Sequence, residues 1–89
     1  MKLTIIDAGL TFSKEDGYVG YVHFEAEGHK EPYEMTLQKK NGKEWSYGLF
    51  FLNASGGEEQ LFEVEELLEE SDEAFDELIT AAKRTLDKS

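Results

Sequence analysis

The hydrophobic pattern changes its period near residue 57, and this change constrains the fold more than any other feature of the chain. Up to residue 53, apolar and polar residues alternate, which is typical of half-buried antiparallel strands. After residue 57, apolar residues recur every three or four positions, as on one face of a helix. The segment NASGGEE separates the two parts with small, turn-forming residues. The sequence therefore predicts an α+β fold, a four-stranded antiparallel meander sheet with one or two C-terminal helices packed on one face (ββββα or ββββαα).

Turn dipeptides divide the N-terminal part into four expected strands, at residues 2–12, 18–27, 33–39 and 44–53. Asp16-Gly17 and Asn41-Gly42 are typical of tight hairpin turns, which need left-handed backbone torsions. Ala8-Gly9 predicts an irregularity in the first strand, because glycine inside a strand often marks a bulge. The run LFFL at residues 49–52 predicts a fourth strand that is covered on both faces or lies centrally.

The C-terminal part carries one continuous apolar stripe. Eight residues fall on one side of a helical wheel: Leu61, Val64, Leu68, Phe75, Leu78, Ile79, Ala82 and Leu86. Ser71, followed by Asp72 and Glu73, is also a good N-cap with acids in a first turn. The segment is therefore either one helix or two helices that meet near residue 70, with the same face directed inward.

Length and composition fit a single domain over residues 1–89, with the sheet in 1–54 and the helical part in 58–87. A chain of 89 residues with 39% hydrophobic residues can bury a core without metal or disulfide support. Its lack of cysteine excludes a disulfide framework, a thiolate metal site and a cysteine nucleophile. The short apolar run near the N-terminus stops at Asp7, too early for a signal peptide or a membrane span. We expect a cytoplasmic protein.

Charge is concentrated at the C-terminal end. Of the net charge of −11, residues 58–89 contribute −9, with twelve acids and three bases. Such a surface disfavours direct binding to nucleic acid or to an anionic membrane, because both are themselves negative. A basic protein surface would be attracted to it.

The segment EEQLFEVEELLEESDEAFDE, residues 58–77, holds eleven carboxylates in twenty positions and no lysine or arginine. On a helical wheel one column of acids contains Glu59, Glu63, Glu66, Glu70, Glu73 and Glu77, and a second contains Glu58, Glu65, Glu69, Asp72 and Asp76. A solvated helix face usually interleaves lysines, since each pair stabilises it by about 0.2 to 0.5 kcal/mol. Two interpretations stay open: a surface for a basic partner, with a nucleic-acid mimic as one form of it, or an acidic surface that only confers solubility.

Phe62 bears on that choice. If the helix has already begun at residue 62, this side chain points among the acids and offers an aromatic anchor, as interface hot spots often do. If the helix begins later, Phe62 belongs to an extended lead-in and can join the core. The sequence leaves both alternatives open.

Residues for catalysis or metal binding are sparse. His23, Glu25, Glu27 and His29 occupy alternate positions of one expected strand and form a weak candidate metal or small-ligand site. Such positions stand about 6.5 to 7 Å apart, too far for a compact site without ligands from a neighbouring strand. The ordinary interpretation is a polar, solvated sheet face. We expect no enzyme, no catalytic residue and no cofactor.

One helical layer cannot cover both faces of four strands. The uncovered face, with Val19, Tyr21 and also Phe50 and Leu52, is either modestly exposed or a surface for a homodimer. The function predicted from the sequence is a small acidic, non-enzymatic protein that acts as an adaptor, inhibitor or regulator of a basic partner. The expected partner-binding residues are Glu59, Glu63, Glu66, Glu70, Glu73, Glu77 and Phe62.

Overall fold

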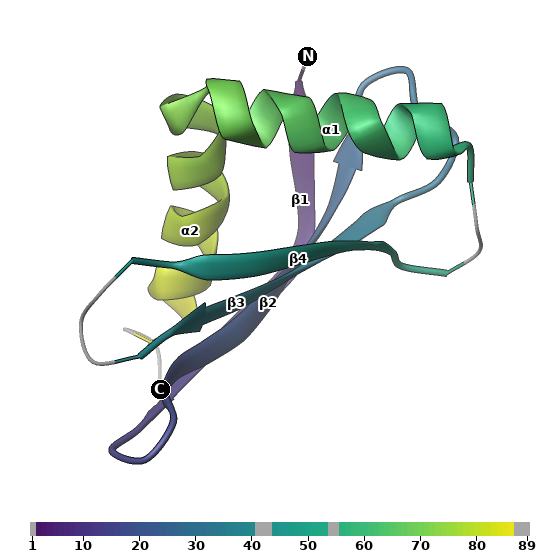
Figure 1. The fold of residues 1–89 in the computed structure, drawn as a ribbon. Helices are drawn as coiled ribbons and strands as arrows, with labels where there is room; N and C mark the ends of the chain where they lie inside the picture. Colours follow the sequence, from purple (N-terminus) through teal and green to yellow (C-terminus); the bar gives the residue numbers. More distant parts are fainter. Residues whose placement is uncertain (1, 41–43, 54–55, 87–89) are drawn as a thin grey trace.

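The fold is an antiparallel sheet followed by two helices, as seen in a computed structural model that describes residues 2–40, 44–53 and 56–86. The elements are β1 (Leu3–Ser13), β2 (Gly17–Ala26), β3 (Tyr33–Lys39), β4 (Ser46–Phe51), α1 (Glu58–Glu70) and α2 (Asp72–Leu86) (Figure 1). The predicted α+β meander is confirmed in its ββββαα form. None of the described helices is both long and apolar enough to cross a membrane.

Each strand pairs with its neighbour in the chain, so the sheet order is β1-β2-β3-β4. Gly17 makes the first hairpin turn with φ of 74°, and a Cβ atom there would lie 2.4 Å from the Lys39 carbonyl oxygen. A side chain at this position is therefore opposed by both torsion and space. The second predicted hairpin turn, Asn41-Gly42, lies outside the described residues.

The irregularity in β1 lies elsewhere than predicted. The register between β1 and β2 shifts between Ile5 and Asp7, not at Ala8-Gly9. Gly9 has a different role, because a Cβ atom on it would lie only 2.7 Å from the Tyr21 ring. The glycine makes room for an aromatic ring on the neighbouring strand and causes no bulge.

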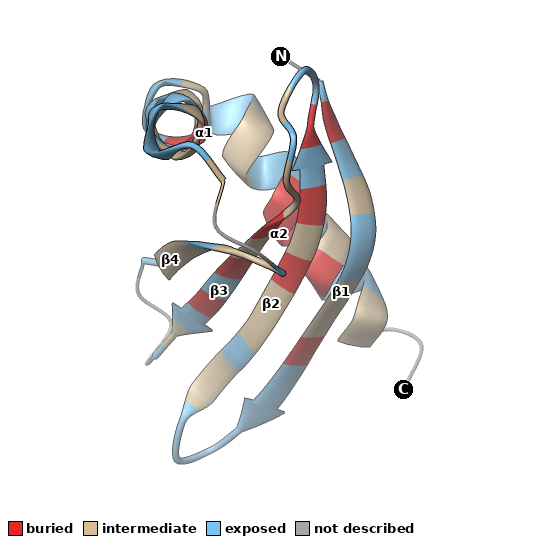
Figure 2. Ribbon diagram, turned by 90° about the vertical axis from the view of Figure 1, so that its right-hand side faces the viewer, coloured by how far each residue is buried: buried red, intermediate tan, exposed pale blue. Residues whose placement is uncertain are grey.

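The core lies between one face of the sheet and the helices. The buried residues of β2 and β3 are Val22, Phe24, Ala26, Tyr33, Met35 and Leu37, and Tyr18, which alternation puts on the same side of β2, is partly buried. In Figure 2 buried and less buried positions alternate along β2, as expected for a sheet with one covered face. From the helices, Val64, Leu68, Leu78, Ile79 and Ala82 complete this cluster, which confirms the inward direction of the apolar stripe.

The prediction for the fourth strand was wrong, because β4 lies at the edge of the sheet. Leu49 and Phe51 pack against the core, whereas Phe50 is 53% exposed on the opposite face. The run LFFL is therefore apolar on both faces without being covered on both. Its position at an edge is central to the binding proposals below.

Ser71 separates the two helices. Its backbone is extended, with φ of −116° and ψ of 105°, and its N–H donates to the Leu67 carbonyl to close α1. Its hydroxyl oxygen accepts a hydrogen bond from the Ala74 N–H at 3.3 Å, the bond of an N-cap residue at the start of α2. The two helices consequently run in clearly different directions (Figure 1).

Candidate functional site

The strongest candidate surface is on α1, a helix of thirteen residues with seven glutamates and no base. Glu58 and Glu59 lie in its first turn, where negative charge is favourable next to the free backbone N–H groups. Glu69 and Glu70 lie in its last turn, where the helix dipole disfavours negative charge. The acidic composition of α1 therefore goes beyond what helix stability favours.

Phe62 is exposed among these acids. Because α1 begins at Glu58, residue 62 is already helical, and its side chain is 61% exposed. Of the two alternatives left open by the sequence, the structure supports the exposed one. Glu59, Glu63, Glu66 and Glu70 are exposed on the same helix. We call these four glutamates together with Phe62 the α1 acidic surface.

The predicted column of six glutamates is not one continuous row. Glu73 and Glu77 are exposed, but they belong to α2, which starts after the break at Ser71 and takes another direction (Figure 1). A helical wheel assumes a straight helix, so it aligned residues that the change of direction at Ser71 separates (Figure 1). The continuous part of the column is limited to the four glutamates of α1.

Glu63 has a partner within the fold. Its carboxylate lies 3.6 Å from His29 Nε2, and His29 Nδ1 forms a 2.8 Å hydrogen bond with the Tyr33 hydroxyl. The His29 side chain is only 5% exposed, so this contact anchors α1 to the connection between β2 and β3. Burial raises the pKa of the Tyr33 hydroxyl, and the charge of Glu63 acts in the same direction.

A groove of about 670 Å³ lies between α1 and β4. We call it the α1–β4 groove, and its lining residues are Tyr47, Gly48, Leu49, Phe62, Glu65, Glu66, Glu69 and Glu70. At its wall the Tyr47 hydroxyl donates a 2.7 Å hydrogen bond to Glu69 Oε1. Burial raises the pKa of Tyr47 to about 12, supported by this bond and by the charges of Glu69 and Glu65.

The β4 residues of this groove were missed as site residues in the sequence. Tyr47 packs against the core, with its ring centroid 5.4 Å from that of Phe75. What the sequence could not supply was the position of α1 beside β4. Glu65 and Glu69, by contrast, belong to the second column of acids that the helical wheel predicts.

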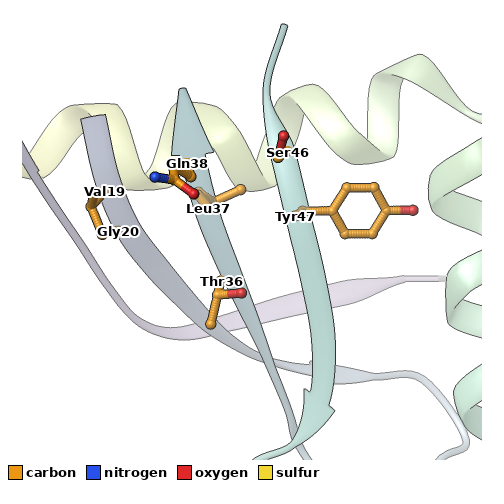
Figure 3. A pocket seen from close by; sticks show the side chains of 7 residues that line it. All are labelled: Val19, Gly20, Thr36, Leu37, Gln38, Ser46 and Tyr47. Carbon is orange, nitrogen blue, oxygen red and sulfur yellow. The ribbon is translucent and has the colours of Figure 1, made fainter. Parts of the chain in front are cut away.

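The uncovered sheet face carries both polar pairs and apolar side chains. His23 Nε2 lies 2.9 Å from Glu34 Oε2, and the Tyr21 hydroxyl donates to Asp7 Oδ2 at 3.2 Å. The bond to Asp7 raises the pKa of Tyr21, and the charge of Asp7 adds to this effect. Near these pairs a shallow hollow of about 390 Å³ opens over three neighbouring strands, with lining residues that include Val19, Thr36, Gln38 and Ser46 (Figure 3).

The four residues of the candidate metal site are not brought together. His23 contacts Glu34 on the uncovered face, whereas His29 contacts Tyr33 and Glu63 beside α1. Glu25 and Glu27 are exposed. Within residues 2–40, 44–53 and 56–86, no group of three or more histidine, cysteine or acidic side chains could hold a metal ion.

Comparisons of the chain with protein-family models, with curated proteins and with solved structures found no match.

Proposed function

We propose that this chain is a small, non-enzymatic protein of the cytoplasm that binds the basic surface of another protein through its α1 acidic surface. It would act as an adaptor, an inhibitor or a regulator of that partner. One observation carries the proposal: Phe62, a large apolar side chain, is 61% exposed in the middle of a helix with seven glutamates and no base.

The charge of α1 lowers the stability of the fold, and this supports the proposal that the glutamates are kept for binding. Like charges three or four positions apart destabilise a helix by about 0.2 to 0.5 kcal/mol each, and Glu59, Glu63, Glu66 and Glu70 are spaced in this way. Among the described residues the only ion pair of α1 is that of Glu63 with His29. Of the other carboxylates of α1, Glu69 accepts a hydrogen bond from Tyr47, and the rest can pair with lysine or arginine side chains of a partner.

Phe62 can contribute binding affinity that the charge of α1 alone does not provide. Exposed carboxylates attract a basic protein over a distance and raise the association rate, but each exposed ion pair adds little affinity. A buried aromatic anchor contributes a larger share of binding free energy. Phe62 beside Glu66 and Glu69 lines the same groove, so a partner could bury the ring and pair with the carboxylates together.

The α1 acidic surface supports a binding function better than the uncovered sheet face does. On that face His23 and Glu34, and Tyr21 and Asp7, already satisfy one another. Val19 is 42% exposed and lies opposite Thr11 and Gln38, and Phe50 is 53% exposed and lies opposite Glu34. Homodimerisation or ligand binding through this face stays a prediction from the sequence.

The proposal is tested by capture of partners from a cell lysate with three forms of the chain. These are the wild type, the variant E66K/E70K in the α1 acidic surface, and the control E25K/E27K, which makes the same change in charge at exposed positions of the sheet end. We expect basic proteins to be retained by the wild type and by the control, and released by salt near 0.5 M, where the screening length falls to about 4 Å. E66K/E70K should retain little of them.

Two outcomes would contradict the proposal. One is equal capture by E66K/E70K and by the control, since binding would then follow net charge rather than α1. The other is a wild type that captures nothing beyond the background of an uncoated matrix. If captured proteins are released by added DNA, the α1 acidic surface occupies a nucleic-acid-binding site of its partner.

A further inference from the structure

The edge of β4 is a second feature of the same region, and it specifies how a partner can bind there. β4 pairs with β3 on one side, and the sheet ends on its other side. An open edge presents unpaired backbone N–H and C=O groups to other chains, and proteins usually protect it with charges, proline or a bulge. The sequence of β4, SYGLFF, has no charge and no proline, whereas β1 at the other edge has Asp7 and a register shift.

The free backbone groups of β4 can be assigned by alternation. The Leu52 N–H donates to the Pro32 carbonyl at 3.1 Å, so residue 52 directs its backbone groups toward β3. In antiparallel pairs every second residue does the same. The N–H and C=O groups of Tyr47, Leu49 and Phe51 therefore point to the open edge, and no described residue outside the sheet forms a backbone hydrogen bond with them.

The open edge adjoins the α1–β4 groove. Tyr47, Gly48 and Leu49 line this groove from β4, and Phe62, Glu65, Glu66, Glu69 and Glu70 line it from α1. A strand added to β4 would lie about 4.8 Å from it, with every second side chain directed to the helix side of the sheet. Those side chains would meet the glutamates and Phe62.

The negative charge of the α1–β4 groove determines which kind of chain can bind there. Four glutamates line it, and none of them forms an ion pair with a lysine or arginine among the described residues. A second copy of the chain, paired through its own β4, would bring another acidic α1 close and so would be repelled. Lysine or arginine on an added strand would instead lie about 6.5 to 7 Å apart on one face, within reach of successive carboxylates of α1.

We propose that the partner binds as an extended, lysine- or arginine-bearing segment that adds a fifth strand to the open edge of β4 in the α1–β4 groove. This inference rests on the proposed function, because it takes the α1 acidic surface as the contact region. Backbone hydrogen bonds to Tyr47, Leu49 and Phe51 would supply affinity, and the glutamates would select basic side chains.

The test uses synthetic peptides of alternating lysine and valine, with and without N-methyl groups on the backbone amides that would pair with β4. The two peptides have the same charge and side chains, but only the unmethylated one can form the ladder. We expect the unmethylated peptide to bind about tenfold or more tightly than the methylated one, because the methylated peptide cannot form two or three of the backbone hydrogen bonds. It should also slow hydrogen exchange at the amides of Tyr47, Leu49 and Phe51, and E66K/E70K should weaken its binding.

Other outcomes overturn the inference in ways that separate it from the proposed function. Equal binding of both peptides, lost in E66K/E70K, would mean that α1 binds basic chains by charge alone and that no strand is added. Failure of both peptides, with partner capture by α1 intact, would exclude an extended basic segment and leave the proposed function standing. Protection of the β4 amides without peptide, with a doubled molar mass, would show that a second copy occupies the edge.

Discussion

At the scale of single residues, Tyr47 joins the two sides of the candidate site. It belongs to β4, yet its hydroxyl donates to Glu69 of α1 at 2.7 Å, and its ring lies beside Phe75 of α2. A hydrogen bond to a charged acceptor stabilises more than one between neutral groups, although partial exposure weakens it here. Together with the contact between Glu63 and His29, this bond connects α1 to the sheet and so contributes to the shape of the α1–β4 groove.

We expect Tyr47→Phe to lower the free energy of unfolding by about 1 kcal/mol at pH 7, through loss of this bond. The pKa of Tyr47 is raised from 10.0 to about 12 in the folded chain, so the folded state holds its proton where the unfolded state has lost it. This contribution is complete below pH 10 and is lost as the pH rises from about 10 to about 12. Urea unfolding followed by the fluorescence of Trp45, at several pH values, measures both effects.

The pKa values of Tyr21 and Tyr33 are also raised, so the wild type loses stability over this alkaline range for three reasons. Tyr47→Phe should lose less than the wild type between pH 10 and pH 12. Tyr21→Phe serves as a comparison on the uncovered face. An alkaline loss in Tyr47→Phe equal to that of the wild type would show that ionisation of Tyr47 does not contribute to the alkaline loss of stability.

Sequence periodicity predicted inward and outward positions well, but it could not predict pairs between distant residues. Val22, Met35 and Leu78 are buried as expected, because alternation and helical spacing directly encode which face is apolar. Tyr47 and Glu69 stand twenty-two positions apart, and no local pattern connects them. The exposure of Phe62 could be predicted only if the first residue of α1 were known, because it depends on whether residue 62 is helical.

At the scale of elements, Ser71 decides that the C-terminal part is two helices. Its N–H closes α1 at Leu67, and its hydroxyl accepts the Ala74 N–H that opens α2. The change of direction at Ser71 lets α2 pack on β1 and β2 while α1 lies beside β4 (Figure 1).

Ser71→Ala should therefore lower the free energy of unfolding by about 1 kcal/mol, the usual cost of losing an N-cap side chain. Ser71→Thr keeps a capping hydroxyl and should lie within a few tenths of a kcal/mol of the wild type. Both are measured by urea unfolding at one pH. If threonine is as destabilising as alanine, the Ala74 hydrogen bond is not what stabilises the junction.

The elements that the sequence placed incorrectly share a physical cause. The bulge was assigned to Gly9, but that glycine makes room for the Tyr21 ring across the strand pair. The run LFFL predicts a strand that is covered on both faces or central, but β4 lies at the edge and Phe50 is exposed. The role of Gly9 and the exposure of β4 both depend on which strand or side chain lies opposite. Tertiary packing determines this arrangement, and the local sequence pattern does not.

At the scale of the whole molecule, the distribution of charge opposes stability. Residues 58–89 hold a net charge of −9, and the acids of α1 extend into its last turn, where the helix dipole disfavours them. Self-repulsion of this kind destabilises a compact state and is screened by salt. The charge distribution therefore lowers the stability of the fold, which is what we expect of a surface kept for binding.

Stability and binding should consequently change in opposite directions when α1 loses charge. We expect the free energy of unfolding in urea to rise by about 1 kcal/mol between about 0.02 M and about 0.5 M sodium chloride, because repulsion is screened. Glu66→Lys should give a similar gain at low salt, since Glu63, Glu69 and Glu70 lie three or four positions from residue 66, and it should flatten the dependence on salt. Glu25→Lys, with the same change in net charge, should gain less. A variant that becomes more stable and yet loses its basic partner would establish that these carboxylates serve binding, whereas a loss of stability in Glu66→Lys would mean that they support the fold.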